Sequence, residues 1–88
     1  MNIDEATHII LKPYVTEKTF ALVENESRIC FLVKENTNKS KILEAVKILY
    51  NETPLTVNVC KTVYGKKAFV KFESVEKARD LATKIGML

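Results

Sequence analysis

The segment from Thr56 to Phe72 restricts the fold more than any other part of this chain. Its branched and aromatic residues predict two β-strands, and Gly65-Lys66 predicts a two-residue type II′ turn between them. The expected cross-strand pairs are Tyr64–Lys67, Thr62–Phe69 and Cys60–Lys71 on one face, and Val63–Ala68, Lys61–Val70 and Val59–Phe72 on the other. The segment therefore predicts an antiparallel hairpin with one mixed face and one face that is apolar apart from Lys61.

Helix and strand patterns alternate along the rest of the chain. The expected elements are a short strand at Ile9–Lys12, a helix from a Thr16 cap to about Glu24, a strand at Arg28–Lys34, a helix from about Lys39 to Tyr50, the hairpin, and a last helix from a Ser74 cap through about Ile85, ended by Gly86. The order (β)αβαββα predicts an α+β fold, with a largely antiparallel sheet and helices packed on it.

The 88 residues allow one small domain, spanning 1–88, that must use nearly all of its apolar side chains as core. The sequence contains no apolar run long enough to cross a bilayer, and its first residues, MNIDEATH, carry acids where an export signal would be basic. We therefore expect a cytoplasmic protein. Two isolated cysteines, Cys30 and Cys60, are expected to be buried reduced thiols, and a disulfide between them is the alternative.

Positive charge is concentrated in the middle of the chain. Residues 1–33 contain three basic and five acidic side chains, residues 34–71 eight and three, and residues 72–88 three of each, which gives the total of +3. Four of the central lysines lie in the hairpin, which has no acid: Lys61, Lys66, Lys67 and Lys71. Such a cluster favours binding to a polyanion, although lysines that only keep the sheet soluble and guard its edge are the alternative.

The segment Asn36–Lys41 is a second basic candidate. Lys39 and Lys41 fall in the first turn of the predicted helix, where the dipole already presents partial positive charge. A phosphate bound at the free backbone N–H groups would turn this repulsion into attraction, whereas a solvated loop end is the alternative. The two basic segments can act together only if they lie on one side of the fold.

Other polar residues suggest no reaction centre. Glu17 is the type of acid that commonly complements a helix dipole, and His8 has no companion at ligand or triad spacing, so it is expected at the surface. The chain has no nucleophile–base pair, no glycine-rich phosphate loop and no zinc motif, so neither an enzyme nor a cofactor is expected. Phe69 can either stack on an unpaired base or be covered by the last helix.

Four segments together resemble the universal large-subunit ribosomal protein twenty-three family. They are KPYVTEKT (Lys12–Thr19), FLV (Phe31–Val33), NKSKILEAV (Asn38–Val46) and the hairpin motifs VNV and GKKAFVKF within Val57–Phe72. The resemblance covers nearly the whole chain. It implies a three-layer α/β/α sandwich with an antiparallel sheet of three to four strands, and binding to large-subunit rRNA beside the polypeptide exit tunnel.

The resemblance also implies site residues and partners. The expected rRNA contacts are Lys12, Lys18, Lys39, Lys41, Asn58, Lys61, Thr62, Lys66, Lys67 and Lys71. Glu17 matches an acid that docks a chaperone in bacterial members, so it becomes a candidate contact for signal recognition particle, a nascent-chain complex or the translocon. Neighbouring ribosomal proteins are further expected partners, whereas a small-molecule substrate and direct membrane insertion are not.

One departure from the family pattern concerns the hairpin turn. Bacterial members carry a long extension between the last two strands, and the short sequence Tyr64–Lys67 leaves no room for it. The chain therefore resembles the short archaeal type, in which the hairpin would act as an anchor on rRNA. The alternatives are a free-standing protein-interaction module with a basic sheet edge and a stand-alone RNA-binding domain outside the ribosome.

Overall fold

The computed structural model describes residues 2–63 and 65–86. Its elements, in chain order, are α1 (Ile3–Ile9), β1 (Ile10–Pro13), α2 (Glu17–Glu26), β2 (Arg28–Val33), α3 (Lys39–Tyr50), β3 (Thr56–Thr62), β4 (Gly65–Lys71) and α4 (Val75–Lys84). From β1 onward this is the predicted order. All strand pairs in the sheet are antiparallel, which confirms the α+β class.

Helix α1 was not predicted, and it moves the first strand to Ile10–Pro13. The side chain of Asn2 caps the helix by accepting a hydrogen bond from the Glu5 N–H at 2.8 Å. Asp4 and Glu5 lie in the first turn, where the helix dipole favours negative charge. Ala6 and Ile9 are buried on one side of the helix, so this short helix is held mainly by its contact with the core.

The longer helices begin and end at recognisable residues. Thr16 and Ser74 cap α2 and α4 as predicted, since each side chain accepts a hydrogen bond from a backbone N–H in the first turn. Helix α2 continues past Glu24 to Glu26 and ends where Ser27 adopts a left-handed conformation, with φ of 59°. At the end of α4, Gly86 has φ of 84° and donates its N–H to the Thr83 carbonyl, as expected for a C-terminal glycine.

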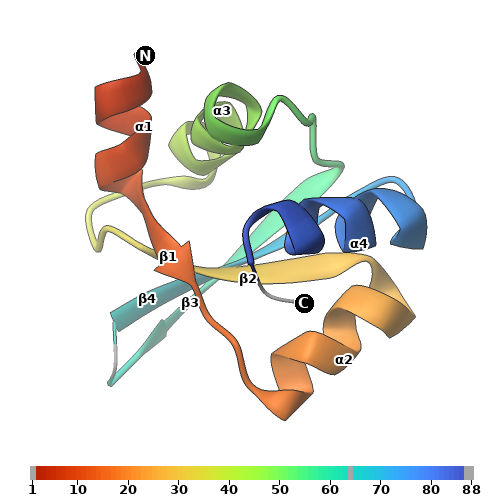
Figure 1. The fold of residues 1–88 in the computed structure, drawn as a ribbon. Coiled ribbons are helices and arrows are strands. Elements are labelled where there is room, and N and C mark those ends of the chain that lie inside the picture. Colours follow the sequence, from red (N-terminus) through yellow and green to blue (C-terminus); the bar gives the residue numbers. More distant parts are fainter. Residues whose placement is uncertain (1, 64, 87–88) are drawn as a thin grey trace.

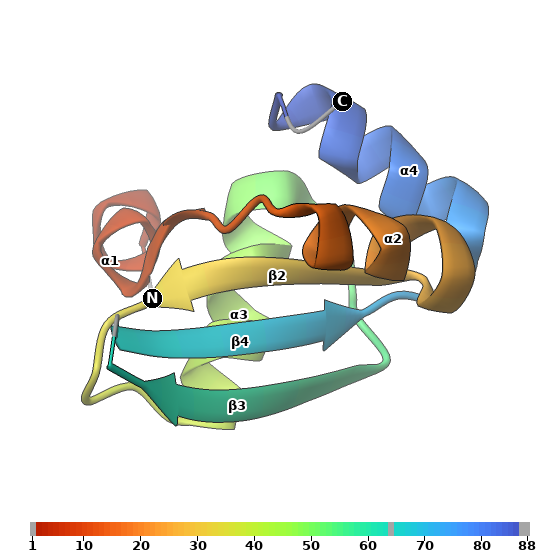
Figure 2. The same cartoon turned by 90° about the horizontal axis from the view of Figure 1, so that it is seen from below.

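The sheet has the strand order β1-β2-β4-β3 and lies between helices (Figures 1 and 2). In Figure 2, α3 lies behind the sheet and α2 lies in front of β2. In the same view, no helix of the described chain covers the front of β4 and β3. Helix α4 packs against α2 and also contacts β2. The three-layer arrangement is therefore complete at β2 and incomplete over the hairpin.

The core lies mainly between the sheet and α3. The rows Ile29–Val70–Val57 and Phe31–Ala68–Val59 cross three strands on one face. Phe31 and Val70 are fully buried, and the Phe31 ring stacks on Tyr50 of α3 with 5.7 Å between ring centroids. Burying a side chain of this size contributes about 1.5–3 kcal/mol, so these rows fix which face of the hairpin turns inward.

The hairpin register differs from the prediction. Thr62 pairs with Gly65, so the turn is centred two residues earlier than the expected Gly65-Lys66 loop. The observed partners include Val59–Ala68 and Cys60–Lys67, and Gly65, with φ of 121°, starts β4. The shift is physically reasonable because β4 is also aligned by β2, which pairs Phe31 with Ala68. The expected Tyr64–Lys67 pair lies outside the described residues.

The two predicted faces of the hairpin are nevertheless correct. Side chains alternate along a strand, so moving a turn by two residues leaves each side chain on its original face. Cys60, Thr62 and Phe69 lie on one face of the hairpin, and Val59 and Lys61 lie on the other.

Candidate nucleic-acid interface

The sheet carries charge of one sign. Its four strands contain six basic side chains and no acidic one: Lys12, Arg28, Lys61, Lys66, Lys67 and Lys71. Four of these, Lys12, Arg28, Lys67 and Lys71, project from the face that α3 does not cover. Lys12 shares a row with Leu32 and Lys67, and the Arg28–Lys71 pair lies an even number of residues away on the same two strands. A surface with this charge pattern attracts phosphates.

We call the uncovered side of β3 and β4 the open face, which carries Asn58, Cys60, Lys67, Phe69 and Lys71 (Figure 2). Asn58 and Cys60 are exposed, and the three β4 side chains are half-buried. Lys12 extends this face across β2, since it lies in the same row as Lys67 and Cys60. The open face therefore joins lysines from β1 and β4 that are far apart in the sequence.

Lys67 and Tyr14 link the open face to the segment before α2. The Lys67 ammonium lies 3.8 Å from the centroid of the Tyr14 ring, a cation–π contact. The Tyr14 N–H donates to the Cys30 carbonyl at 2.8 Å, which holds this segment against β2. Tyr14 was not among the predicted site residues, although it lies within the KPYVTEKT motif.

The two cysteines have different environments. Cys30 is fully buried in β2, as predicted, and burial raises the pKa of its thiol to about 11, with the nearby Lys67 cation partly offsetting that effect. Cys60 is exposed on the open face, so the prediction that both thiols are buried was wrong for this residue. Its place opposite Lys67, on an edge strand, explains the exposure.

Phe69 lies at the border between the core and the open face. It lines a pocket of about 220 Å³ between β4 and α2, which we call the aromatic pocket. The residues that line this pocket are Tyr14, Thr16, Lys18, Thr19, Leu22, Lys67 and Phe69. The helix that lines this pocket with Phe69 is thus α2, whereas one of the two predicted alternatives placed the last helix over Phe69.

The second basic segment lies directly beside the hairpin. Lys66 donates hydrogen bonds from its ammonium group to the carbonyl oxygens of Thr37 at 2.6 Å and Glu35 at 3.3 Å. These carbonyls belong to the loop that leads into α3, and Asn38 caps α3 by accepting from the Lys41 N–H at 2.9 Å. The condition that both basic segments lie on one side of the fold is therefore met for Lys61 and Lys66 only, because Lys67 and Lys71 point from the opposite face of the sheet.

We call this part of the molecule the turn end; it comprises Lys61, Lys66 and residues 34–41. Lys61 pairs directly with Lys66, and Lys61, Lys39 and Lys41 are exposed. Lys66 itself is half-buried and engaged with backbone carbonyls, so its main contacts are within the protein. The Thr62 hydroxyl likewise donates to the Gly65 carbonyl at 2.9 Å, across the turn.

The remaining predicted residues lie around these two surfaces. Lys18 is exposed on α2 and lines the aromatic pocket. Glu17 is exposed in the first turn of α2, and His8 is exposed on α1, as predicted. Arg28, which was not predicted, pairs with Lys71, and its Nε atom is buried with no hydrogen-bond partner among the described residues.

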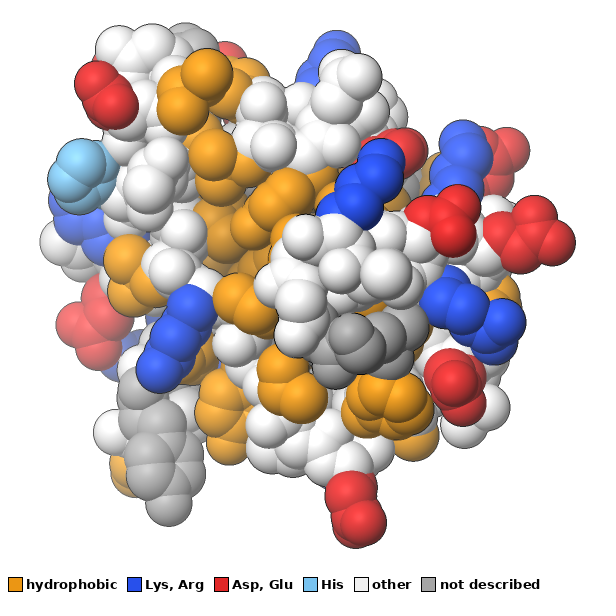
Figure 3. Space-filling view, in the orientation of Figure 1, with side chains coloured by type: hydrophobic (Ala, Val, Ile, Leu, Met, Phe, Trp, Pro, Cys, Tyr) orange, Lys and Arg blue, Asp and Glu red, His pale blue; other side chains and the backbone are white. Residues whose placement is uncertain are grey.

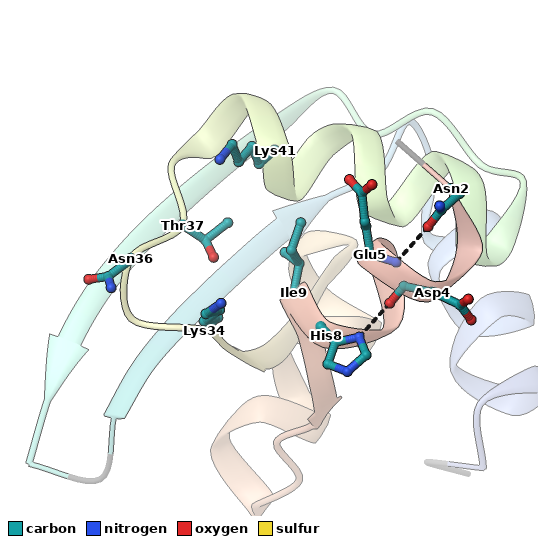
Figure 4. Close-up of a pocket in the computed structure, with 9 residues that line it drawn as sticks. All are labelled: Asn2, Asp4, Glu5, His8, Ile9, Lys34, Asn36, Thr37 and Lys41. Carbon is teal, nitrogen blue, oxygen red and sulfur yellow. Dashed lines mark hydrogen bonds between the residues drawn. The ribbon is translucent and has the colours of Figure 1, made fainter.

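A larger groove, of about 490 Å³, lies between α1 and the loop before α3 (Figure 4). Asp4 and Glu5 line it together with Lys34 and Lys41, so the charges of its walls are balanced. His8 Nδ1 lies 2.6 Å from the Asp4 carbonyl oxygen, within the same helix. This mixture of charges gives the groove no preference for a polyanion.

The side of the molecule seen in Figure 3 also differs from the open face. Hydrophobic side chains form a band down its middle, and acidic and basic side chains are mixed on its right side, over α2 and α4. Within residues 2–63 and 65–86, no three His, Cys, Asp or Glu side chains are grouped to hold a metal ion. Over the same residues, no helix has the length and apolar character to cross a membrane.

Comparisons with known proteins give one consistent result. The chain matches a family model described as Ribosomal protein L23 over residues 8–84. It is 44% identical over 80 residues to the large ribosomal subunit protein uL23 of Methanobrevibacter smithii, covering 90% of this chain and 93% of the relative. The protein of the same name from Methanococcus vannielii is 37% identical over 84 residues, which cover 94% of this chain and 98% of the relative. The large ribosomal subunit protein uL23 of Puccinia graminis is 38% identical over 85 residues, which cover 96% of this chain and 54% of the relative.

Proposed function

The chain belongs to the ribosomal protein L23 family, and we propose that its open face and turn end anchor it to large-subunit rRNA beside the polypeptide exit tunnel. As a member of this family it is a structural constituent of the large ribosomal subunit and not an enzyme. The observation that carries the rRNA proposal is the sheet with six basic and no acidic side chains, joined to the lysines of α3 through Lys66.

The residues of the two surfaces have different roles in this proposal. Exposed groups make the direct contacts with phosphate and sugar: Lys12, Lys18, Lys39, Lys41, Asn58 and Lys61. Lys67 and Lys71 are half-buried and contribute positive charge at the base of the open face. Lys66 and Thr62 act mainly by holding the loop before α3 and the hairpin turn in place.

The short hairpin supports an anchoring role. Thr62 and Gly65 are paired across the turn, so the connection between β3 and β4 has no extension that could enter a tunnel. The uncovered area beside the hairpin suits recognition of folded RNA by shape and phosphate contacts, with little reading of base edges.

We extend the proposal to Glu17 as a docking residue. Its carboxylate is exposed at the start of α2, on a helix that flanks the sheet. In an rRNA-bound protein it would remain available to signal recognition particle, a nascent-chain complex or the translocon. Replacing Glu17 with Lys should weaken such docking on intact ribosomes and leave rRNA binding unchanged, whereas Glu24→Lys on the same helix serves as a matched control.

Sedimentation tests the proposed function. The protein should remain with large subunits when they are pelleted through a high-salt cushion, because many contacts with folded rRNA act together. A free-standing interaction module would wash off under the same conditions. Binding to deproteinised large-subunit rRNA should also weaken with salt, with a log–log slope of about 0.7–0.9 per phosphate neutralised. A flat salt response would contradict the electrostatic part of the proposal.

A further inference from the structure

The aromatic pocket combines two rings and two cations in a small space. Tyr14, from the segment between β1 and α2, and Phe69, from β4, are half-buried walls of the pocket, and Lys67 and Lys18 lie in the same lining. No acidic residue of the described chain lines it. Its volume of about 220 Å³ is below the roughly 300–1,000 Å³ of pockets that enclose drug-sized ligands, so it suits one small planar group.

Two other hollows of the described chain, both larger than the aromatic pocket, lack this combination. The groove beside α1 contains Asp4 and Glu5, and its one ring, the His8 imidazole, is held against the Asp4 carbonyl. The hollow near the turn end contains Glu35 and is otherwise lined by aliphatic, amide and lysine side chains together with Gly65. A planar ring that carries a phosphate would be favoured by stacking and by cations together, and among these three only the aromatic pocket supplies both without an acidic side chain.

We propose that the aromatic pocket receives one unpaired nucleotide of the bound RNA. The base would pack against Phe69 and the exposed part of Tyr14, and its phosphate would lie near Lys18 and Lys67. The pocket opens beside the open face, since Lys67 and Phe69 belong to both, so an RNA lying on the open face can reach it. This inference rests on the proposed rRNA binding and adds a specific requirement for an unpaired base.

Three variants of the full chain test the stacking. Phe69→Leu should reduce the affinity for deproteinised large-subunit rRNA by about 5- to 100-fold, the range expected for losing one base–aromatic contact. Phe69→Tyr should stay within about twofold of the wild type, because the ring is kept. Phe20→Leu makes the same change at a half-buried position of α2 outside the pocket, and it should leave the affinity unchanged. None of these changes should alter the salt slope, since stacking releases no counterions.

A fluorescence measurement covers the case in which Phe69→Leu fails to fold. The chain contains no tryptophan, so Phe69→Trp places a single reporter in the pocket while keeping a stacking ring. We expect rRNA to quench its emission at the same concentrations at which it binds. Unchanged emission at saturating rRNA would overturn the inference, as would wild-type affinity of a folded Phe69→Leu. If the wild type bound no rRNA, the proposed function would fail first, so the two failures are distinguishable.

Discussion

The Lys66 ammonium lies 2.6 Å from the carbonyl oxygen of Thr37, so a side chain of β4 holds the loop that leads into α3. Thr37 is itself buried, and its N–H donates to the Lys34 carbonyl at 3.2 Å. This contact places Lys66 and its cross-strand partner Lys61 next to the lysines of the α3 start. It also means that a lysine expected to bind RNA contributes first to the order of the fold.

Lys66 should therefore matter for stability. We expect Lys66→Met to lower the free energy of unfolding by about 1–2 kcal/mol, because two backbone carbonyls lose a charged donor. Lys61→Met is the matched control, since Lys61 is the exposed cross-strand partner and its removal relieves like-charge proximity. Denaturant unfolding of the three proteins measures both effects. Equal losses for the two variants would show that the Lys66 contacts do not stabilise the fold.

Lys12 provides a cleaner test of phosphate binding than Lys66. It is exposed on β1, and no hydrogen bond or ion pair within the described chain is assigned to its ammonium group. Lys12→Met should leave the melting temperature unchanged and reduce the salt slope of rRNA binding by about 0.7–0.9. Lys84→Met, at an exposed position in the last turn of α4 that belongs to neither the open face nor the turn end, should leave the slope unchanged. An unchanged slope for Lys12→Met would remove β1 from the interface.

The core depends strongly on Phe31. Its ring is fully buried between the sheet and Tyr50 of α3. Phe31→Ala should lower the free energy of unfolding by about 3–5 kcal/mol, through lost burial and a residual cavity. Val63, which is 93% exposed at the hairpin turn, provides the contrast, because Val63→Ala should change stability by no more than about 0.5 kcal/mol. Comparable losses at the two sites would contradict the described packing.

Cys30 should make stability depend on alkaline pH. Burial raises the pKa of its thiol from 9.0 to about 11, so the unfolded chain loses this proton at lower pH than the folded one. The resulting contribution to stability is complete below about pH 9 and is lost as the pH rises to about 11. Over this interval the wild type should lose up to about 3 kcal/mol more than Cys30→Ala. Denaturant unfolding across the interval measures the difference, and parallel curves would contradict the assigned burial.

Much of the fold is predictable from local patterns. The helix over Lys39–Tyr50 has both the apolar spacing and the cap of a core-facing helix, and its predicted bounds are the observed ones. Helix α1 has the same kinds of signal, namely the Asn2 cap and the Ala6–Ile9 pair, but two buried positions are too few to establish a period. Its stability comes from contacts with α3, which local sequence does not specify.

The hairpin shows what sequence reasoning determines and what it misses. Alternation along the strands determines which side chains share a face, and this was correct. The position of the turn depends on the alignment of β4 with β2, a non-local constraint that placed Gly65 after the turn and not within it. The same limit applies to Lys66, whose Thr37 partner is distant in sequence. It also applies to Cys60, which is exposed because no helix of the described chain covers the front of β3 and β4.

The exposed thiol of Cys60 allows the most direct measurement of the central claim, that rRNA covers the open face. Because Cys30 is buried, a maleimide reagent should modify Cys60 selectively in the free protein. Binding to large-subunit rRNA should slow this modification by at least about tenfold, since Cys60 lies in one row with Lys67 and Lys12. If Cys60 reacted at the same rate in free protein and in the rRNA-bound complex, the open face would not be the rRNA-binding surface.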